Sequence, residues 1–350
     1  MNTILKYTCP IALAIALTAC GGSNSTKSEP ITTASDLTDS STTITQPEAV
    51  YNLHPDDVAE YVEEFKYKYD QLELQIDGVQ YDISVHSTDV EKKVIYARYE
   101  KGFLSFGFDF IEGVPLAKLY VIETGTEDLG AAHEEVDAYL AGYDISIEFD
   151  DDDNAIYTGR LNNITQQDFN VRLVINDSVV SSGSTTLAIE GAIATIKGEL
   201  GTKTYIQVQD LINNNPEVTT LLLQTITGSV DDDINSHTGR LVRNAQLTTK
   251  VEKGSRIYSG GVDLFASGYQ RVYESGAIVG VHSWCCESGK TADQLSEDDP
   301  AHKSQLTYFR EMLGDELGPE FYFFTINAAP FDSIHEMSDA EMSKYLLKDD

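Results

Sequence analysis

The stretch that most constrains the fold runs over residues 219–284, because it repeats a strand, a tight turn and a helix. It opens with an apolar run at 221–223, which is typical of a strand buried on both faces. The later members are a turn at 227–229, a helix at 230–244, a strand at 256–258, a turn at 259–261, a helix at 262–267 and a strand at 277–281. This alternation predicts an α/β domain.

A strand–helix–strand unit leads into this stretch. Its expected elements are a strand at 192–200, a helix at 204–213 and the buried strand at 219–224. Such a unit implies a right-handed crossover and a parallel sheet. The turns after three of the strands then meet at one edge of that sheet, where they bring Gly228, Ser259 and His282 together.

Three motifs, taken in order, resemble those of a known family. They are Gly228-Ser229-Val230 after the apolar strand, Ser259-Gly260 at the start of a helix, and His282 at the end of the next strand. Together they resemble the proteolytic subunit of the Clp protease, in the crotonase-like superfamily. The chain is similar in particular to secreted Clp-protease-like proteins of bacteria, over roughly residues 190–350.

The resemblance implies a serine hydrolase that acts on peptides or other acyl substrates. Ser259 would be the nucleophile, and His282 would be the general base. The N–H groups of Gly228 and Gly260 would form the oxyanion hole, because only a backbone without Cβ can approach a substrate carbonyl closely. Taken alone, Gly228 also suits a tight turn, and Ser259 suits an ordinary helix N-cap.

The third member of a catalytic triad is less well defined by the resemblance. The family's carboxylate lies just before the last helix, where this chain has Ile334. Asp332 is the nearest carboxylate upstream and is our candidate to orient the imidazole of His282. His335, Glu336 and Asp263 are alternatives, and a Ser–His pair without a third member is also compatible with the sequence. Ser338 and Glu341 predict a capping box that starts the last helix.

Three adjacent carboxylates complicate the hydrolase interpretation. Asp231, Asp232 and Asp233 directly follow the predicted oxyanion turn. Acidic residues stabilise the first turn of a helix by about 0.3–1 kcal/mol each, which is sufficient reason for their presence. Carboxylates that point at the hole would oppose an oxyanion, so an acyl-transfer site requires them to face away.

Residues 49–185 have a different pattern and predict a β-rich α+β domain that precedes the domain at 186–350. A helix is expected at 55–69, and alternating apolar and polar residues follow it. Asp77-Gly78 is a hairpin signal. The acidic run at 150–154 lacks the ligand spacing of an EF-hand and is interpreted as a solvated turn.

The charge of the chain limits its partners. There are 24 Lys and Arg residues against 57 Asp and Glu residues, which gives a net charge of −33. This acidic balance argues against binding to nucleic acid or to an anionic lipid surface through a basic face.

The first residues predict a lipoprotein signal peptide over 1–19. Residue Lys6 and a short apolar core are followed by Leu17-Thr18-Ala19-Cys20, which resembles a bacterial lipobox. Cys20 would be lipidated and would begin a Ser/Thr-rich tether over 20–48. Gly21 resembles the residue that sorts such proteins to the outer membrane. We therefore expect a lipid-anchored protein of the bacterial cell envelope, facing the periplasm or the surface.

Cys285 and Cys286 are adjacent, which leaves three states open: a strained redox-active bridge, intermolecular bonds or buried thiols. A zinc site made with His282 would remove the base and lacks a fourth ligand. We therefore expect no metal and no cofactor. An apolar helix at 300–313 and an apolar segment at 321–324 follow. Crotonase-like domains use late helices to cover the site or to pack subunits, which is compatible with a homo-oligomer.

The sequence is compatible with two function classes. The first is a serine hydrolase that uses Ser259 and His282. The second is a binding or assembly lipoprotein that keeps the crotonase-like scaffold without its chemistry. The matched Ser and His favour the first class, whereas the acidic turn and the undefined third partner favour the second.

The anchor can be tested separately from the chemistry. We expect Cys20→Ser to move the protein from the membrane fraction to the soluble fraction, because the substitution removes the thiol that accepts the lipid. Fractionation together with metabolic labelling by a fatty acid measures this. Unchanged fractionation and an unlabelled wild-type protein would contradict the anchor.

Overall fold

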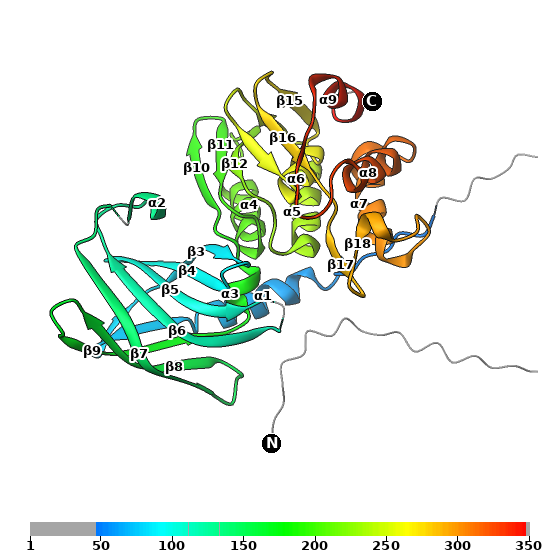
Figure 1. Cartoon of the computed structure of the whole chain (residues 1–350). Helices are drawn as coiled ribbons and strands as arrows, with labels where there is room; N and C mark the ends of the chain where they lie inside the picture. The colour runs from blue at the N-terminus through cyan, green and yellow to red at the C-terminus, as the bar shows by residue number, and fades with distance from the viewer. Residues whose placement is uncertain (1–46, 111, 133, 348–350) are drawn as a thin grey trace, which may run out of the picture. The chain divides into compact units, whose positions relative to one another are not determined.

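The computed structural model describes residues 47–110, 112–132 and 134–347. The expected signal peptide, Cys20 and nearly all of the tether lie outside the described residues. From Ala49 onward the chain forms one compact unit that contains two large sheets (Figure 1). Among the described residues, no helix is long and apolar enough to cross a membrane.

The first large sheet has nine strands, and all of its pairings are antiparallel. The strands are β1 (Glu73–Ile76), β2 (Val79–Tyr81), β3 (Ser84–Asp89), β4 (Val94–Tyr99), β5 (Gly102–Asp109), β6 (Val114–Glu123), β7 (Ala138–Phe149), β8 (Ala155–Asn163) and β9 (Asp168–Ile175). Their order is β2-β1-β9-β8-β7-β6-β5-β4-β3. The helix α1 (Val58–Tyr69) precedes this sheet, and the short helices α2 (Leu129–Ala132) and α3 (Ser178–Ser181) accompany it.

The alternating pattern produces this sheet because successive side chains point to opposite faces. In β4, for example, Ile95, Ala97 and Tyr99 are buried, whereas the residues between them are only partly buried. The predicted hairpin between β1 and β2 is confirmed. Asp77 and Gly78 both have positive φ, of 49° and 77°, as a two-residue type I′ turn requires.

The second large sheet is mainly parallel, with antiparallel strands at two edges. Its strands are β10 (Thr186–Glu190), β11 (Ile193–Lys197), β12 (Thr220–Ile226), β13 (Thr248–Val251), β14 (Arg256–Tyr258), β15 (Gln270–Tyr273), β16 (Ile278–Val281) and β19 (His335–Glu336). The predicted parallel pairing of β12, β14 and β16 is confirmed. Strands β10 and β19 add to the edges in the antiparallel direction.

Helices connect and cover the strands of this second sheet (Figure 1). They are α4 (Thr202–Asn214), α5 (Asp232–Asn244), α6 (Gly260–Ala266), α7 (Lys303–Leu313), α8 (Leu317–Ala328) and α9 (Asp339–Tyr345), with short helical turns at Ala292–Gln294 and Pro300–His302. The predicted capping box of the last helix is confirmed, since Ser338 accepts from the Glu341 N–H. A two-stranded sheet of β17 (Cys285–Glu287) and β18 (Lys290–Thr291) lies outside both large sheets.

The strands of this sheet that the sequence pattern missed include β13 and β15. Each is four residues long and includes charged or polar residues, so neither has a clear alternation. They matter because β12 pairs with β13 along residues 220–222 and with β14 along residues 225–226. The strand β12 therefore divides the sheet into two branches, and the branch of β14 and β16 carries the candidate site.

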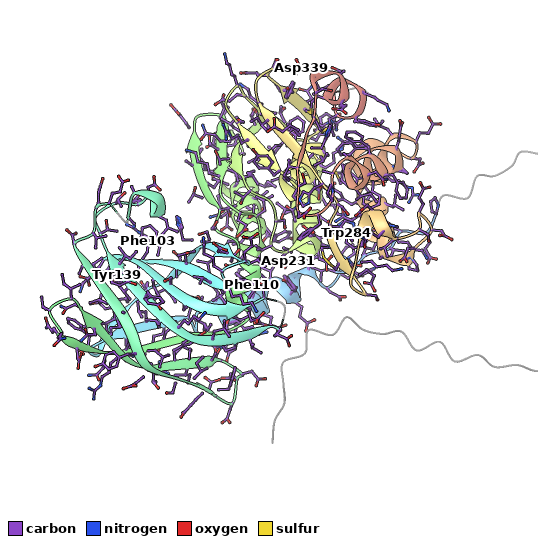
Figure 2. All side chains as sticks on the ribbon, viewed as in Figure 1. Phe103, Phe110, Tyr139, Asp231, Trp284 and Asp339 are labelled. Carbon is purple, nitrogen blue, oxygen red and sulfur yellow. A yellow bond between two sulfur atoms is a disulfide. The ribbon has the colours of Figure 1, made fainter. Side chains whose placement is uncertain are left out.

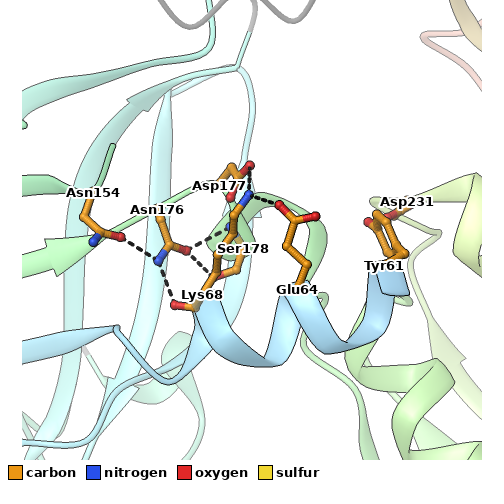
Figure 3. Close-up of polar contacts among 8 residues, drawn as sticks. All are labelled: Tyr61, Glu64, Lys68, Asn154, Asn176, Asp177, Ser178 and Asp231. Atoms are coloured by element: carbon orange, nitrogen blue, oxygen red, sulfur yellow. Dashed lines mark hydrogen bonds and ion pairs between the residues drawn. The ribbon is translucent and has the colours of Figure 1, made fainter. Parts of the chain in front are cut away.

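The helix α1 precedes the first sheet in the sequence, but it packs against helices of the second sheet. Val58 and Val62 share a buried cluster with Tyr205 of α4 and Ile234 of α5. On the same helix, the Tyr61 hydroxyl donates a hydrogen bond to the Asp231 carboxylate (Figure 3). One turn beyond Glu64, Lys68 forms ion pairs with Glu64 and with Asp177.

The Tyr61 contact predicts a measurable contribution to stability. Asp231 also caps α5 by accepting from the Ile234 N–H at 3.2 Å. We expect Tyr61→Phe to lower the free energy of unfolding by about 1–3 kcal/mol, because it removes a donor from a half-buried carboxylate. Urea denaturation measures this. Tyr67→Phe on the same helix is the matched control, because Tyr67 is 62% exposed. Equal effects of the two substitutions would contradict a specific contact.

Candidate functional site

A single pocket brings together residues from β14, β16 and several helices. Its volume, including space that is open to solvent, is about 410 Å³. The lining residues are Asp232, Ser259, Asp263, Val281, His282, Trp284, Gln305, Phe309, Tyr322, Thr325 and Ile326. The predicted nucleophile and base therefore line the same pocket, although they lie at the ends of different strands.

Ser259 occupies a strained turn between β14 and α6. Its φ of +51° and ψ of −125° lie in a region that L-residues rarely adopt. The turn is held by the Ser259 N–H, which donates to the Gly280 carbonyl at 3.0 Å, and by the Val262 N–H, which donates to the Ser259 carbonyl at 2.7 Å. A sharp strand-to-helix turn of this kind exposes a nucleophile above a sheet edge.

The side chain of Ser259 does not cap the helix that it precedes. The ordinary explanation for a serine at this position is an N-cap hydrogen bond, which would hold the hydroxyl against the backbone. Since that bond is absent, the hydroxyl is available to the pocket. A strained backbone without a capping bond is more typical of a functional residue than of a structural one.

Gly228 brings its backbone close to Ser259. Its φ is +146°, and a Cβ built on it would lie 3.5 Å from the Ser259 Cβ. Its carbonyl accepts from the Leu200 N–H at 2.9 Å, while its own N–H meets no acceptor in the described ranges.

Gly260 also has no room for a side chain. A Cβ there would lie 2.5 Å from the Ser229 Cβ, so a larger residue would displace the oxyanion turn. The carbonyl of Gly260 accepts from Asn235 Nδ2 at 3.0 Å. As the first residue of α6, Gly260 has an N–H without an intrahelical partner. Gly228 and Gly260 thus place two free donors beside the serine.

His282 follows the last residue of β16 and is partly buried. Burial lowers its pKa, and the nearby backbone groups of Ser283 and Phe331 partly offset this effect. The Nδ1 atom is buried and has no hydrogen-bond partner among the described residues. The ring of Phe331 packs against the imidazole, with 6.0 Å between the ring centroids. In the described part of the chain no hydrogen bond joins His282 to Ser259.

Asp332 lies outside the pocket, although it neighbours Phe331. Its side chain is exposed and forms no hydrogen bond or ion pair with another described residue. Of the alternatives, His335 contacts Glu341 at 3.2 Å, and Glu336 is exposed. Asp263, one turn after Ser259, is the alternative carboxyl that lines the pocket.

The three carboxylates after the oxyanion turn face in different directions. Asp231 accepts from Tyr61, and Asp233 accepts from Asn52 Nδ2 at 3.0 Å, so both are turned away from the pocket. Asp231 is labelled in Figure 2. Asp232, in contrast, lines the pocket. The requirement that all three face away is therefore met by two of them.

Burial makes the two pocket carboxyls easier to protonate, and a protonated carboxyl does not oppose an oxyanion. The Asp232 side chain as a whole is exposed, but protein crowds its carboxyl; this desolvation raises its pKa to about 6, although a hydrogen bond with Ser229 opposes the shift. The same cause, followed by repulsion from Asp232, raises the pKa of Asp263 well above its usual value. Both groups are thus more readily neutral than ordinary aspartates.

The aromatic part of the wall was not expected from the sequence. Trp284 Nε1 donates to the Tyr322 hydroxyl at 2.9 Å, and His302 Nδ1 shares a 2.7 Å hydrogen bond with the same oxygen. The sequence predicted only an apolar helix at 300–313 and an apolar segment at 321–324 in this region. Only the packing of α8 against β16 and against α7 reveals this wall, since no local signal links these segments.

Cys285 and Cys286 are exposed on β17, and the structure pairs them with each other. This arrangement corresponds to one of the three states that the sequence left open. Among the described residues, no group of three or more His, Cys, Asp or Glu side chains is arranged to hold a metal ion.

No family model and no curated protein sequence matches the chain. Solved structures of crotonase-like proteins do match, at low similarity. An enoyl-CoA hydratase from Bacillus anthracis is 11% identical, with 46% of this chain and 67% of that chain covered and a TM-score of 0.31. A monofunctional enoyl CoA isomerase from M. smegmatis is 12% identical, with 46% and 73% covered and a TM-score of 0.30. An enoyl-CoA hydratase/carnithine racemase from Magnetospirillum magneticum is 14% identical, with 47% and 66% covered and a TM-score of 0.31. Likeness this distant carries no information on activity, so the chemistry must come from the pocket itself.

Proposed function

We propose that this protein is a serine hydrolase of peptide or other acyl substrates, built on a crotonase-like scaffold. The observation that carries the proposal is the strained, uncapped Ser259 in a pocket that it shares with His282. A nucleophile, a base and two free backbone donors within one cavity are the parts that acyl transfer requires.

The proposed reaction has two halves. The Ser259 hydroxyl oxygen attacks the substrate carbonyl carbon, and its proton passes to His282. The N–H groups of Gly228 and Gly260 stabilise the negative oxygen, a contribution typically worth about 2.7–4 kcal/mol per donor. The intermediate collapses, His282 gives its proton to the leaving group, and an acyl-enzyme remains. Water then attacks the acyl-enzyme with His282 as base, which releases the acid and restores Ser259.

His282 would act without a carboxylate partner. Its lowered pKa keeps the imidazole neutral at neutral pH, which is the form that accepts a proton. The missing contact with Ser259 does not exclude the role, because catalytic hydrogen bonds are often long before a substrate binds. The absence of an orienting group at Nδ1 predicts a slower enzyme than one with a complete triad.

A binding or assembly protein on the same scaffold is the second candidate. Asp232 favours it, because a carboxylate on the pocket wall opposes an oxyanion whenever it is ionised. The unpaired Nδ1 of His282 favours it as well. This candidate retains the pocket as a ligand site and assigns no chemistry to Ser259.

We also propose that a lipid on Cys20 anchors the protein to the bacterial cell envelope, at the outer membrane. We propose in addition that the protein assembles as a homo-oligomer. The lipobox-like segment before Cys20 supports the anchor. The acidic surface would keep the folded part away from anionic headgroups, so the lipid would be the membrane contact.

The nucleophile is tested with an active-site probe. We expect Ser259→Ala to abolish labelling of the full chain by a fluorophosphonate or β-lactone, because no other group would take the acyl or phosphonyl group. His282→Ala is expected to reduce labelling nearly as far, and Asp332→Asn much less. Gel fluorescence measures the labelling rate, and a peptide-library digest accompanies it because some serine hydrolases label poorly.

The control for this experiment is Ser236→Ala at a partly exposed position of α5 outside the pocket, which should label like the wild type. If the wild type neither labels nor cleaves, and Ser259→Ala retains the cellular phenotype, the protein is not a hydrolase.

The pH dependence provides a separate test on an uncharged ester. Protonation of His282 should lower kcat/KM on the acidic side. Because its pKa is lowered, this fall should occur at a pH below the ordinary pKa of histidine. Ionisation of Asp232 lowers it above about pH 6, since the carboxylate then opposes the oxyanion. We expect Asp232→Asn to remove the alkaline limb and leave the acidic limb in place. Two identical profiles would show that Asp232 does not face the reacting oxygen.

Stability should follow the same titration. The folded-state pKa of Asp232 lies above its unfolded value of 3.8, so its favourable contribution is present at low pH and is lost as the pH rises through about 6. Urea denaturation should therefore show the wild type losing stability relative to Asp232→Asn as the pH rises from 3.8 to about 6. Parallel curves for the two proteins would contradict the raised pKa.

A further inference from the structure

We propose that the pocket selects substrates that carry a cationic group, such as a lysine or arginine side chain, beside the acyl carbon. This inference rests on the proposed hydrolase site and names its substrate class. It arises from the charges and the rings that line the cavity, which the acyl-transfer chemistry does not itself require.

The charged groups of the cavity are all of one sign. Asp232 comes from α5 and Asp263 from α6, so two separate helices each contribute a carboxyl to the wall. No Lys or Arg is among the lining residues. The titratable and polar groups that the other elements present are His282, Gln305, Tyr322 and Thr325. With His282 neutral, a cation would meet two acids and no opposing charge.

The remaining wall suits the same ligand. Trp284, Phe309 and Tyr322 contribute aromatic rings to the cavity. The face of such a ring attracts a cation, and the attraction grows when water is excluded. The hydrogen bonds that Trp284 and His302 form with the Tyr322 hydroxyl hold the Trp284 and Tyr322 rings in place, and His302 is only 1% exposed. Trp284 is labelled in Figure 2. The wall is therefore fixed before a ligand arrives.

A bound cation would also resolve the conflict between Asp232 and the oxyanion. Burial and mutual repulsion raise the pKa of both carboxyls, so each one holds its proton to a higher pH than an ordinary aspartate. An ammonium or guanidinium group stabilises their ionised forms, so binding releases protons to the solvent. The same positive charge then lies between the carboxylates and the reacting oxygen and reduces their repulsion. Neutral and anionic substrates gain neither effect, and the net charge of −33 favours the approach of cations.

Matched esters test the selectivity. Kinetics of the full chain at pH 7.5 compare the p-nitrophenyl esters of N-acetyl-lysine and N-acetyl-norleucine, which have similar length and differ in charge. We expect kcat/KM to be about tenfold or more higher for the lysine ester, as for a close charge pair in a partly desolvated site. Asp263→Asn and Asp232→Asn should each bring this ratio toward one. Asp210→Asn on an exposed position of α4 is the matched control and should keep the wild-type ratio.

Binding is measured independently of turnover. Trp284 is the single tryptophan of the chain, so its fluorescence reports on the pocket without any label. In Ser259→Ala, titration with N-acetyl-lysine amide should change this fluorescence and, in weakly buffered solution near pH 6, should release protons. N-acetyl-norleucine amide should do so only at concentrations about tenfold higher or more. The binding titration needs no substitution of either pocket carboxyl.

The outcomes separate this inference from the proposed function. Turnover of both esters at a ratio near one, unchanged by either aspartate substitution, overturns the cationic preference and leaves the hydrolase intact. Selective binding of the lysine amide without turnover of any ester overturns the hydrolase and supports a cation-binding pocket. The absence of both turnover and selective binding overturns both.

Discussion

The site depends on the parallel pairing of β12, β14 and β16. Parallel neighbours end at the same edge, so the turn after β12, the turn after β14 and the residue after β16 meet although they are far apart in sequence. The antiparallel meander of the first sheet offers no comparable edge. The first half of β12 pairs with β13, and only its last residues pair with β14. The point at which β12 changes partner therefore sets where the oxyanion turn lies.

Burial decides the chemistry of this edge more than residue identity does. An exposed aspartate is ionised at neutral pH, and an exposed histidine has a pKa close to its ordinary value. In this pocket, burial raises the pKa of Asp232 and of Asp263 and lowers that of His282, so all three become more readily neutral. The cavity thus holds groups that are ready to exchange protons or to charge when an ion arrives. Both proposals for the pocket use this property.

The segment before the first sheet supports the site from outside. Asn52 donates a hydrogen bond to Asp233, and Tyr61 donates one to Asp231. The Leu53 carbonyl lies 2.9 Å from His237 Nε2. These contacts hold the first turns of α5, the helix that continues from the oxyanion turn. They leave Asp232 as the one member of the acidic triplet that lines the pocket. The direction of each carboxylate is therefore set by neighbours distant in sequence.

The sequence alone determined the local elements and their order. Apolar runs predicted β12, α5, β14 and β16, because a buried strand and an amphipathic helix each have a characteristic period. Asp77-Gly78 predicted its hairpin because its backbone conformation is local. The strain at Ser259, the placement of the Asp232 and Asp263 carboxyls in the pocket and the wall of Trp284 and Tyr322 were decided only by the tertiary structure. Each depends on which distant segment packs against it, and that choice arises from burial across the whole sheet, which no local pattern encodes.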